Sequence, residues 1–351
     1  MTVAGAISGG GTTTPLFSPP FVVFLGDIQS APYAKTAFGL AEWRAADCLG
    51  QIRLPGCSVD VGVPDLDLDG ALSAGARSLV IGSAAVGGGV PATWIPTLRA
   101  AAERGLDIVA GLHLRLASLE GLAEAAARGG ARLVDLRVPP AGLPVGTGRK
   151  RSGRRLLTVG TDCACGKKYT ALRLARDLAT LGVAADFRAT GQTGIMISGT
   201  GLPLDAVVAD FLTGAAEALS PDAPPNHWDI VEGQGALFHP GYLQVTVGLL
   251  VGSQPDAFVV CHDPQRMHVM GWPTFPLPTI QQVIDRTVAL GQLTNPGIRC
   301  VGIALNTAGM SVSERASHLA KHAAETGLPC VDPLIEGTTP IIERLFQEFP
   351  A

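Results

Sequence analysis

Residues 159–170 read VGTDCACGKKYT and join a short apolar run, RLLTVG (155–160), to a stretch with helical periodicity, KKYTALRLARDLATLG (167–182). A strand, a glycine turn and a Gly-Lys pair at a helix start suit an anion, because unpaired backbone N–H groups point at it and the lysine adds positive charge. The stretch therefore predicts a phosphate-binding loop at the carboxyl end of a strand in an α/β domain. A tight strand-to-helix turn without a ligand is the alternative.

The loop departs in two ways from the loops of nucleotide hydrolases. Five residues separate Gly160 from Gly166, where the strict pattern has four. Lys168 follows Lys167, where Ser or Thr would place its hydroxyl on Mg²⁺. A second cation there repels a metal ion. Thr170 cannot replace the missing hydroxyl, because it lies two residues further round the helix and points elsewhere. The loop is thus predicted to hold phosphate without cleaving it. Its spacing is similar to that of the GTD…GK loops of dethiobiotin-synthetase-like P-loop proteins.

The composition is that of a well-packed protein of two domains. The chain has 351 residues, of which 47% are hydrophobic, 5% aromatic and 16% charged. A formal net charge of -4 argues against broad attraction to nucleic acid or anionic membranes, so an anion must be held by a local site. Neither a signal peptide nor a transmembrane helix is expected. Seven scattered cysteines without metal-type spacing lead us to expect a cytoplasmic protein with reduced thiols.

The order of the segments predicts two α/β domains in succession. In the first half, apolar runs such as FVVFLGDI (21–28) and LDIVAGLH (106–113) alternate with helical stretches that end in glycine. Continuous apolar strands between helices indicate a parallel sheet covered on both faces. The basic run PVGTGRKRSGRR (144–155) is interpreted as a solvated linker, with the alternative that one or two of its arginines lie near a bound anion. The predicted organisation is a flexible tail (1–20), a Rossmann-like N-terminal domain (21–143), a linker (144–154) and a P-loop NTPase-like C-terminal domain (155–351).

Five longer segments together resemble one bacterial family. They are GDIQSAPYAKTAFGLAEWR (26–44), GTDCACGKKYTALRLARDL (160–178), DFRATGQTGIMISGTG (186–201), WDIVEGQGALFHPGY (228–242) and VTVGLLVGSQPDAFVVCH (245–262). These segments are similar to the D-glutamate N-acetyltransferase family, whose members were once described as predicted NAD-dependent epimerases. The resemblance covers roughly residues 20–345 and implies transfer of an acetyl group from acetyl-CoA to the amino group of D-glutamate. A GxGxxG turn after the first strand is absent, so the older description finds little support.

The resemblance makes acetyl-CoA the expected co-substrate. Coenzyme A carries phosphates that must be gripped but never cleaved, so we expect the two loop lysines to neutralise them without a metal. Thr190 and Thr193 offer donors for a phosphate or for the thioester oxygen, unless ATGQTG (189–194) is an ordinary turn. Asn306 resembles the asparagine that reads adenine in the same relatives, and a helix cap is the alternative. The residues predicted to bind acetyl-CoA are Gly160, Thr161, Asp162, Cys163, Ala164, Cys165, Gly166, Lys167, Lys168, Tyr169, Thr190, Thr193 and Asn306.

Glu232 and His239 are the candidate catalytic residues. Glu232 lies in VEGQG, which is similar to a segment whose acid holds metal in dethiobiotin-synthetase-like enzymes. Without metal it could instead take the proton of the substrate ammonium, since only the free amine attacks a thioester. His239 is the alternative base, and a structural role stays open for both residues. Direct attack is preferred to an acyl-enzyme on Cys163 or Cys165, because no adjacent histidine is evident in the sequence.

The two carboxylates of D-glutamate match the planar fork of arginine. The candidates are Arg44, Arg188 and Arg266, with Lys35 beside them, and an ordinary ion pair is the alternative for each. We expect the amino acid in a cleft between the domains, no nucleic-acid or membrane partner, and a homodimer as a plausible oligomeric state. Two other functions stay open: a Mg²⁺- and ATP-dependent ligase or kinase of the dethiobiotin-synthetase type, and a sensor that binds CoA or nucleotide without turnover.

Overall fold

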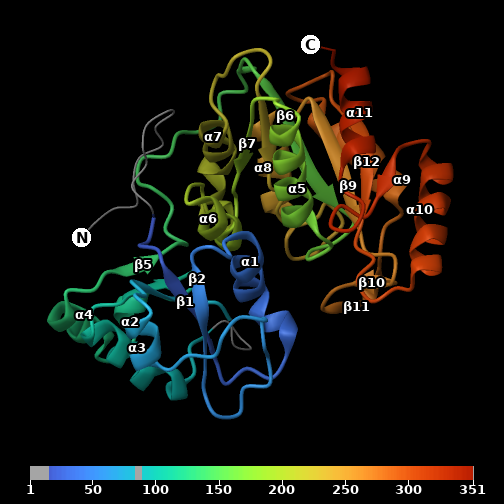
Figure 1. The fold of residues 1–351 in the computed structure, drawn as a ribbon. Helices are drawn as coiled ribbons and strands as arrows, with labels where there is room; N and C mark the ends of the chain where they lie inside the picture. The colour runs from blue at the N-terminus through green and yellow to red at the C-terminus, as the bar shows by residue number, and fades with distance from the viewer. Residues whose placement is uncertain (1–15, 84–88, 351) are drawn as a thin grey trace. The chain divides into compact units, whose positions relative to one another are not determined.

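The computed structural model describes residues 16–83 and 89–350. The chain divides into two compact units, of which the first comprises the residues up to Pro140 together with Gln192–Pro203 (Figure 1). The second comprises Ala141–Gly191 and the chain from Leu204 onward. Each unit is built on a parallel sheet with helices, which confirms the predicted fold class. Most of the predicted tail lies outside the described residues, and Phe17, near its end, is buried.

The first unit contains a five-stranded sheet in the order β2-β1-β3-β4-β5, in which every pairing is parallel. The strands are β1 (Phe21–Gly26), β2 (Cys48–Arg53), β3 (Ser78–Ile81), β4 (Asp107–Ala110) and β5 (Leu133–Asp135). Strands β1, β3 and β4 are buried along their whole length, as expected of apolar runs in a parallel sheet. The helices between the strands are α1 (Lys35–Trp43), α2 (Leu68–Ser73), α3 (Ile95–Glu103) and α4 (Leu122–Gly129).

One further helix of the first unit comes from the C-terminal half of the sequence. Helix α6 (Gln192–Ser198) packs on α1, where the hydroxyls of Thr36 and Thr193 are 2.8 Å apart and Arg44 donates to the carbonyl of Met196 over 3.2 Å. The prediction had placed residues 192–203 in the second domain. The sequence of so short a segment does not indicate which of the two units it packs against.

The second unit contains a six-stranded sheet in the order β13-β12-β9-β6-β8-β7, again parallel throughout. The strands are β6 (Arg154–Gly160), β7 (Ala185–Arg188), β8 (Trp228–Val231), β9 (Ala257–His262), β12 (Arg299–Leu305) and β13 (Cys330–Val331). The helices are α5 (Lys167–Thr180), α7 (Ala209–Leu219), α8 (Leu243–Ser253), α9 (Ile280–Gly291), α10 (Val312–Thr326) and α11 (Thr339–Glu348). A small antiparallel hairpin, β10 (His268–Val269) and β11 (Trp272–Pro276), follows β9.

Helices α5 and α11 cover one face of this sheet. Leu174 and Leu178 of α5 and Ile341 and Leu345 of α11 are fully buried in one cluster with side chains of the strands. Burial of a side chain of this kind stabilises the fold by about 1.5–3 kcal/mol. The rigid sheet holds β6 between β9 and β8, so the loops that follow these three strands meet at one end of the unit.

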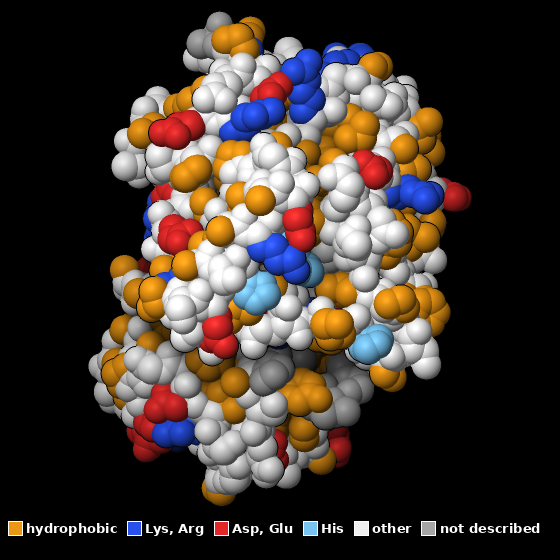
Figure 2. Space-filling model, turned by 90° about the vertical axis from the view of Figure 1, so that its right-hand side faces the viewer, with side chains coloured by type: hydrophobic (Ala, Val, Ile, Leu, Met, Phe, Trp, Pro, Cys, Tyr) orange, Lys and Arg blue, Asp and Glu red, His pale blue; other side chains and the backbone are white. Residues whose placement is uncertain are grey.

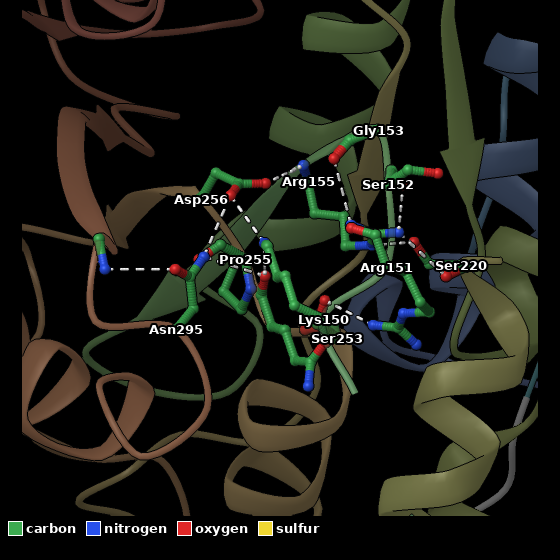
Figure 3. A network of polar contacts seen from close by, with 12 residues as sticks. Lys150, Arg151, Ser152, Gly153, Arg155, Ser220, Ser253, Pro255, Asp256 and Asn295 are labelled. Carbon is green, nitrogen blue, oxygen red and sulfur yellow. Dashed lines mark hydrogen bonds and ion pairs between the residues drawn. The ribbon is translucent and has the colours of Figure 1, made fainter. Parts of the chain in front are cut away.

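The basic run before β6 is not a solvated linker, contrary to the prediction. Arg151 and Arg155 are only 5% and 1% exposed, and they lie at the amino end of β6, the end opposite the phosphate loop. Figure 3 shows their polar contacts. Arg155 donates to the Ser220 hydroxyl over 2.7 Å and to backbone carbonyls, while Arg151 donates to the last carbonyls of α8. The many N–H groups of a guanidinium allow burial where carbonyl acceptors converge. Burial nevertheless lowers the pKa of Arg151 to about 10.

On the face drawn in Figure 2, acidic and basic side chains are interspersed with scattered hydrophobic ones. This mixture agrees with the small formal net charge of -4. In the part of the chain that the structure describes, no helix is long and apolar enough to cross a membrane.

We expect the variant Arg155→Met to lower the free energy of unfolding by about 3 kcal/mol, because it leaves buried acceptors without their donor. Urea unfolding followed by circular dichroism measures this change. Arg149→Met, in the same segment, is the matched control, because Arg149 forms an exposed ion pair with Asp222 and should leave the midpoint near that of the wild type. Equal midpoints for all three proteins would contradict the prediction.

Candidate active site

The phosphate loop, residues 161–166, connects the end of β6 to the start of α5, as predicted. Gly166 has φ +108°, a left-handed conformation that favours glycine, and Ala164, two residues earlier in the loop, has φ +50°. A side chain on Gly160 would bring its Cβ within 2.5 Å of the Cys165 sulfur. The two glycines thus allow the tight turn that brings the loop to the N-terminus of a 14-residue helix.

Lys167 and Cys165 line the inner side of the loop. The Lys167 ammonium, on a side chain only 7% exposed, donates to the Asp162 carbonyl over 2.6 Å. The Cys165 thiol donates to the carbonyls of Asp162 and Cys261, over 3.1 and 3.4 Å. Cys165 therefore packs as a small residue of the loop wall, and its predicted contact with acetyl-CoA stays a prediction.

Arg266, predicted to bind substrate, holds the outer side of the loop. Its Nη1 donates to the Cys163 carbonyl over 2.7 Å and to the Asp162 carboxylate over 3.1 Å, and its Nη2 donates to the Ala164 carbonyl over 2.8 Å. Its Nε pairs with Asp263 at 3.0 Å. A guanidinium with these partners braces the loop, so its role toward a substrate carboxylate stays a prediction.

The hairpin after β9 adds a second brace. The Met270 N–H donates to Oδ2 of Asp162 over 2.9 Å, and the Cys163 N–H donates to Oδ1 over 2.7 Å. Beside it, the Thr161 hydroxyl lies 3.0 Å from Nδ1 of His262. Burial and neighbouring histidines lower the pKa of His262 to about 4, so this ring is neutral at neutral pH. Arg266, the hairpin and His262 therefore each form a hydrogen bond with the phosphate loop.

Lys168 occupies the position of the metal-binding hydroxyl, in the first turn of α5. Its ammonium lies 4.3 Å from the ring centroid of Tyr169. It also lies near enough to Glu232 to act on the ionisation of that carboxyl. The second lysine of the motif thus places its positive charge within electrostatic reach of the acid that ends β8.

Glu232 is 3% exposed and its carboxylate is oriented by backbone groups. Oε2 accepts the N–H groups of Thr190 and Gly191 over 2.9 and 3.1 Å, and the Thr190 hydroxyl donates to the Glu232 carbonyl over 2.8 Å. Burial raises the pKa of the Glu232 carboxyl, while the two N–H groups and the Lys168 ammonium act in the opposite direction. Thr190 therefore holds Glu232, and its predicted contact with a ligand stays untested.

His239 lies in the segment between β8 and α8 and is 1% exposed. A ring nitrogen of His239, the Cys163 sulfur and an Asp162 carboxylate oxygen all lie within 4.8 Å of one another. Sequence reasoning missed this neighbourhood, because His239 follows Cys163 by more than seventy residues and only the pairing of β6 with β8 brings them together. Such a trio could be taken for metal ligands, but the Asp162 carboxylate already accepts bonds from Arg266 and two backbone N–H groups.

The other predicted residues also have partners within the protein. Arg44 pairs with Asp47 at 2.6 Å and lies over the rings of Phe17 and Phe21. Arg188 donates to Asp229 over 2.7 Å.

Thr193 belongs to α6 of the first unit, and Lys35 is an exposed residue at the start of α1. Asn306 does not cap the next helix, since Ser311 does, and its Oδ1 accepts the Ala308 N–H over 3.3 Å. Their predicted roles in binding stay predictions.

A parallel sheet of Rossmann type in the first unit and a strand, phosphate loop and helix in the second define a two-domain P-loop protein. The chain belongs to the DUF1611 family. Residues 144–342 match the family's C-terminal part, described as a P-loop domain of unknown function, and residues 52–139 match its N-terminal part, described as a Rossmann-like domain.

The relatives found by comparison extend over nearly the whole chain. A D-glutamate N-acetyltransferase from Pseudoalteromonas sp. is 43% identical over 328 residues, which cover 93% of this chain and 98% of that protein. A D-glutamate N-acetyltransferase from Tritonibacter scottomollicae is 42% identical over 330 residues, which cover 94% and 99%. The crystal structure of a DUF1611 family protein from Anabaena variabilis is 33% identical, covers 93% of this chain and 99% of its own, and superposes with a TM-score of 0.84. The resemblance predicted from the sequence is confirmed.

We expect Arg266→Gln to loosen the phosphate loop, because it removes the ion pair with Asp162 and the bonds to two loop carbonyls. Hydrogen exchange of the backbone amides at 161–168 should become roughly tenfold faster or more, which corresponds to about 1.4 kcal/mol of local stability. Arg299→Gln is the control, because Arg299 forms an exposed ion pair with Glu348 away from the loop. Exchange rates at the loop that match those of the control would show that Arg266 does not hold it.

Proposed function

We propose that the protein is an N-acetyltransferase that moves the acetyl group of acetyl-CoA to the amino group of D-glutamate. The observation that carries this proposal is its similarity, over more than nine-tenths of the chain, to two proteins named D-glutamate N-acetyltransferase. The phosphate loop supports it independently, because its second lysine replaces the hydroxyl that a Mg²⁺-dependent phosphoryl transfer needs.

In this proposal the phosphate loop holds the phosphates of coenzyme A. The backbone N–H groups at the start of α5 and the ammonium groups of Lys167 and Lys168 supply the donors and the positive charge. A metal ion bound by Glu232 would be repelled by the Lys168 ammonium, whose charge already acts on the ionisation of that carboxyl. A site with an internal cation in place of a metal suits phosphates that stay intact while the reaction takes place at the thioester.

Glu232 is the residue proposed to accept the proton of the substrate ammonium. Its burial raises the carboxyl pKa and so brings it closer to that of an amine, which makes the transfer less uphill. The freed amine attacks the thioester carbonyl carbon, a C–N bond forms, the C–S bond breaks, and the sulfur leaves as the thiolate of coenzyme A. The thiolate takes up the second proton, which the nitrogen loses as it becomes an amide, and Glu232 gives the first proton to solvent. The bonds from Thr190 and Gly191 fix the direction of the carboxylate for this task.

An assay of thiol release tests the reaction. The protein is incubated with acetyl-CoA and either D- or L-glutamate, with and without EDTA, and free coenzyme A is measured with a thiol reagent. We expect release that requires D-glutamate and survives EDTA, because the ammonium groups of the loop need no metal. ATP consumption without thiol release would point to a ligase or kinase, and binding of CoA without either reaction would point to a sensor.

Lys168→Thr restores the residue type of the nucleotide hydrolases and should change which ligand the loop accepts. We expect its affinity for acetyl-CoA to fall by about tenfold or more, because a charge-assisted contact worth roughly 1.5–3 kcal/mol is lost. Binding of ATP should at the same time become dependent on Mg²⁺, because a hydroxyl now stands beside Glu232. Isothermal titration calorimetry measures both affinities, and Lys168→Arg, which keeps the charge, is the control. Unchanged acetyl-CoA affinity in Lys168→Thr would remove Lys168 from the binding site.

A further inference from the structure

Nε2 of His239 is a buried nitrogen that has no hydrogen-bond partner among the residues that the structure describes. The side chain is 1% exposed, so water outside the protein does not replace the missing partner. Leaving a buried donor unpaired costs about 1–3 kcal/mol. A residue beside the phosphate loop that bears this cost is a candidate for contact with the molecule that the loop binds.

The hydrogen bond at the other ring nitrogen shows where the proton of His239 resides. Nδ1 lies 3.1 Å from the backbone nitrogen of Gly241, whose N–H can only donate. Nδ1 is therefore an acceptor without a proton, and the proton of the neutral ring is on Nε2. Burial lowers the pKa of His239, which keeps the ring neutral near neutral pH. His239 thus presents an N–H donor, and not a lone pair, at its unpartnered nitrogen.

The ring is held in a fixed direction by aromatic neighbours. Its centroid lies 4.6 Å from that of Tyr242 and 4.5 Å from that of Trp272. Trp272 belongs to β11, and Met270 of the same hairpin donates to the Asp162 carboxylate. The hairpin therefore holds the histidine and the phosphate loop at the same time, which is the arrangement expected of a preorganised binding group.

The surroundings of the ring suit an anionic oxygen. A ring nitrogen lies within 4.8 Å of the Cys163 sulfur and of an Asp162 oxygen, yet Nε2 bonds to neither. Arg266 and backbone N–H groups offset the negative charge of the Asp162 carboxylate, and Lys167 adds a further positive charge next to it. Burial raises the pKa of the Cys163 thiol, so this sulfur stays protonated and is a poor acceptor.

We propose that His239 is a ligand-binding residue whose Nε2–H donates to a phosphoryl oxygen of the molecule seated in the phosphate loop. The identity of that molecule as acetyl-CoA rests on the proposed function, whereas the donor role holds for any phosphorylated ligand of the loop. His239 is accordingly a binding group that Gly241, Tyr242 and Trp272 position, and the proton of the substrate ammonium goes to Glu232.

Two substitutions at this position separate donation from packing. His239→Phe keeps a ring against Tyr242 and Trp272 but removes the N–H, and His239→Gln keeps an N–H donor near the place of Nε2. His268→Phe is the matched control, because His268 is an exposed residue of the neighbouring strand β10. Calorimetry with acetyl-CoA, ATP and inorganic phosphate as separate probes shows which phosphorylated ligand the donor serves, and thermal unfolding confirms that each variant is folded.

We expect His239→Phe to weaken binding of the preferred probe by about tenfold or more, the loss that a hydrogen bond to a charged group predicts. His239→Gln should recover most of the affinity, and His268→Phe should match the wild type. The loss should be the same at pH 7 and 8, because burial holds the pKa of His239 below its ordinary value and the groups that face the ring, Asp162, Cys163 and Lys167, are present in every variant.

Three results would overturn the assignment. Wild-type affinity in His239→Phe, combined with a lower kcat and loss of the acidic limb of the pH profile, would make His239 a base. An acetyl adduct on Cys163, seen by intact-protein mass spectrometry after incubation with acetyl-CoA alone, would make it the partner of a nucleophilic thiol. Equal loss in the Phe and Gln variants would show a packing role. If acetyl-CoA is not turned over, the proposed function fails, and the binding data for ATP and phosphate still decide the donor role.

Discussion

The candidate site depends on one buried carboxylate, that of Asp162. It is fully buried and accepts hydrogen bonds from the N–H of the next loop residue, from the hairpin and from the guanidinium of Arg266. Taking a carboxylate out of water is costly unless its oxygens are bonded in this way. Because these donors come from the loop after β6 and from the segment after β9, the phosphate loop can keep its shape only while the hairpin and Arg266 stay in place. The neighbouring aromatic ring of Trp272 then sets His239 against the same loop.

Much of the fold follows from patterns that can be recognised in the sequence. Continuous apolar runs such as the one ending at Gly160 lie in the centre of a parallel sheet, and glycine with lysine at 166–167 begins a helix as predicted. Arg151 and Arg155 were misjudged, because a basic run before a strand is usually solvated and only tertiary structure supplies the carbonyls that bury them. The assignment of α6 to the first unit likewise depends on contacts with α1 that carry no signal of their own in the sequence.

The site was predictable in part for the same physical reason. Residues such as Lys167 are placed by the local geometry of strand, loop and helix, so the spacing of the motif is enough to identify them in the sequence. Arg266 has the chemistry of a carboxylate ligand and was predicted as one, yet its acceptors are Asp162 and Asp263 of the protein itself. The sequence position of an arginine does not indicate which carboxylate lies beside it in the folded protein. The proximity of His239 to Cys163 is of the same kind, since it arises from the adjacency of β8 and β6.

The balance of charge around Glu232 gives Lys168 a second task in the proposed reaction. D-glutamate brings two carboxylates, and the general base is a third negative group that must lie close to the amine. Like charges in one site raise each other's pKa and disfavour binding. Arg44, Arg188 and Arg266 are already paired with protein carboxylates, so recruiting one of them for substrate leaves an acid without its partner. The Lys168 ammonium acts on the Glu232 carboxyl from the first turn of α5, directly after the phosphate loop. In the proposed reaction, a lysine at this position would replace the metal for the phosphates and would also offset the repulsion between the base and an acidic substrate, two demands that threonine would leave to a bound ion.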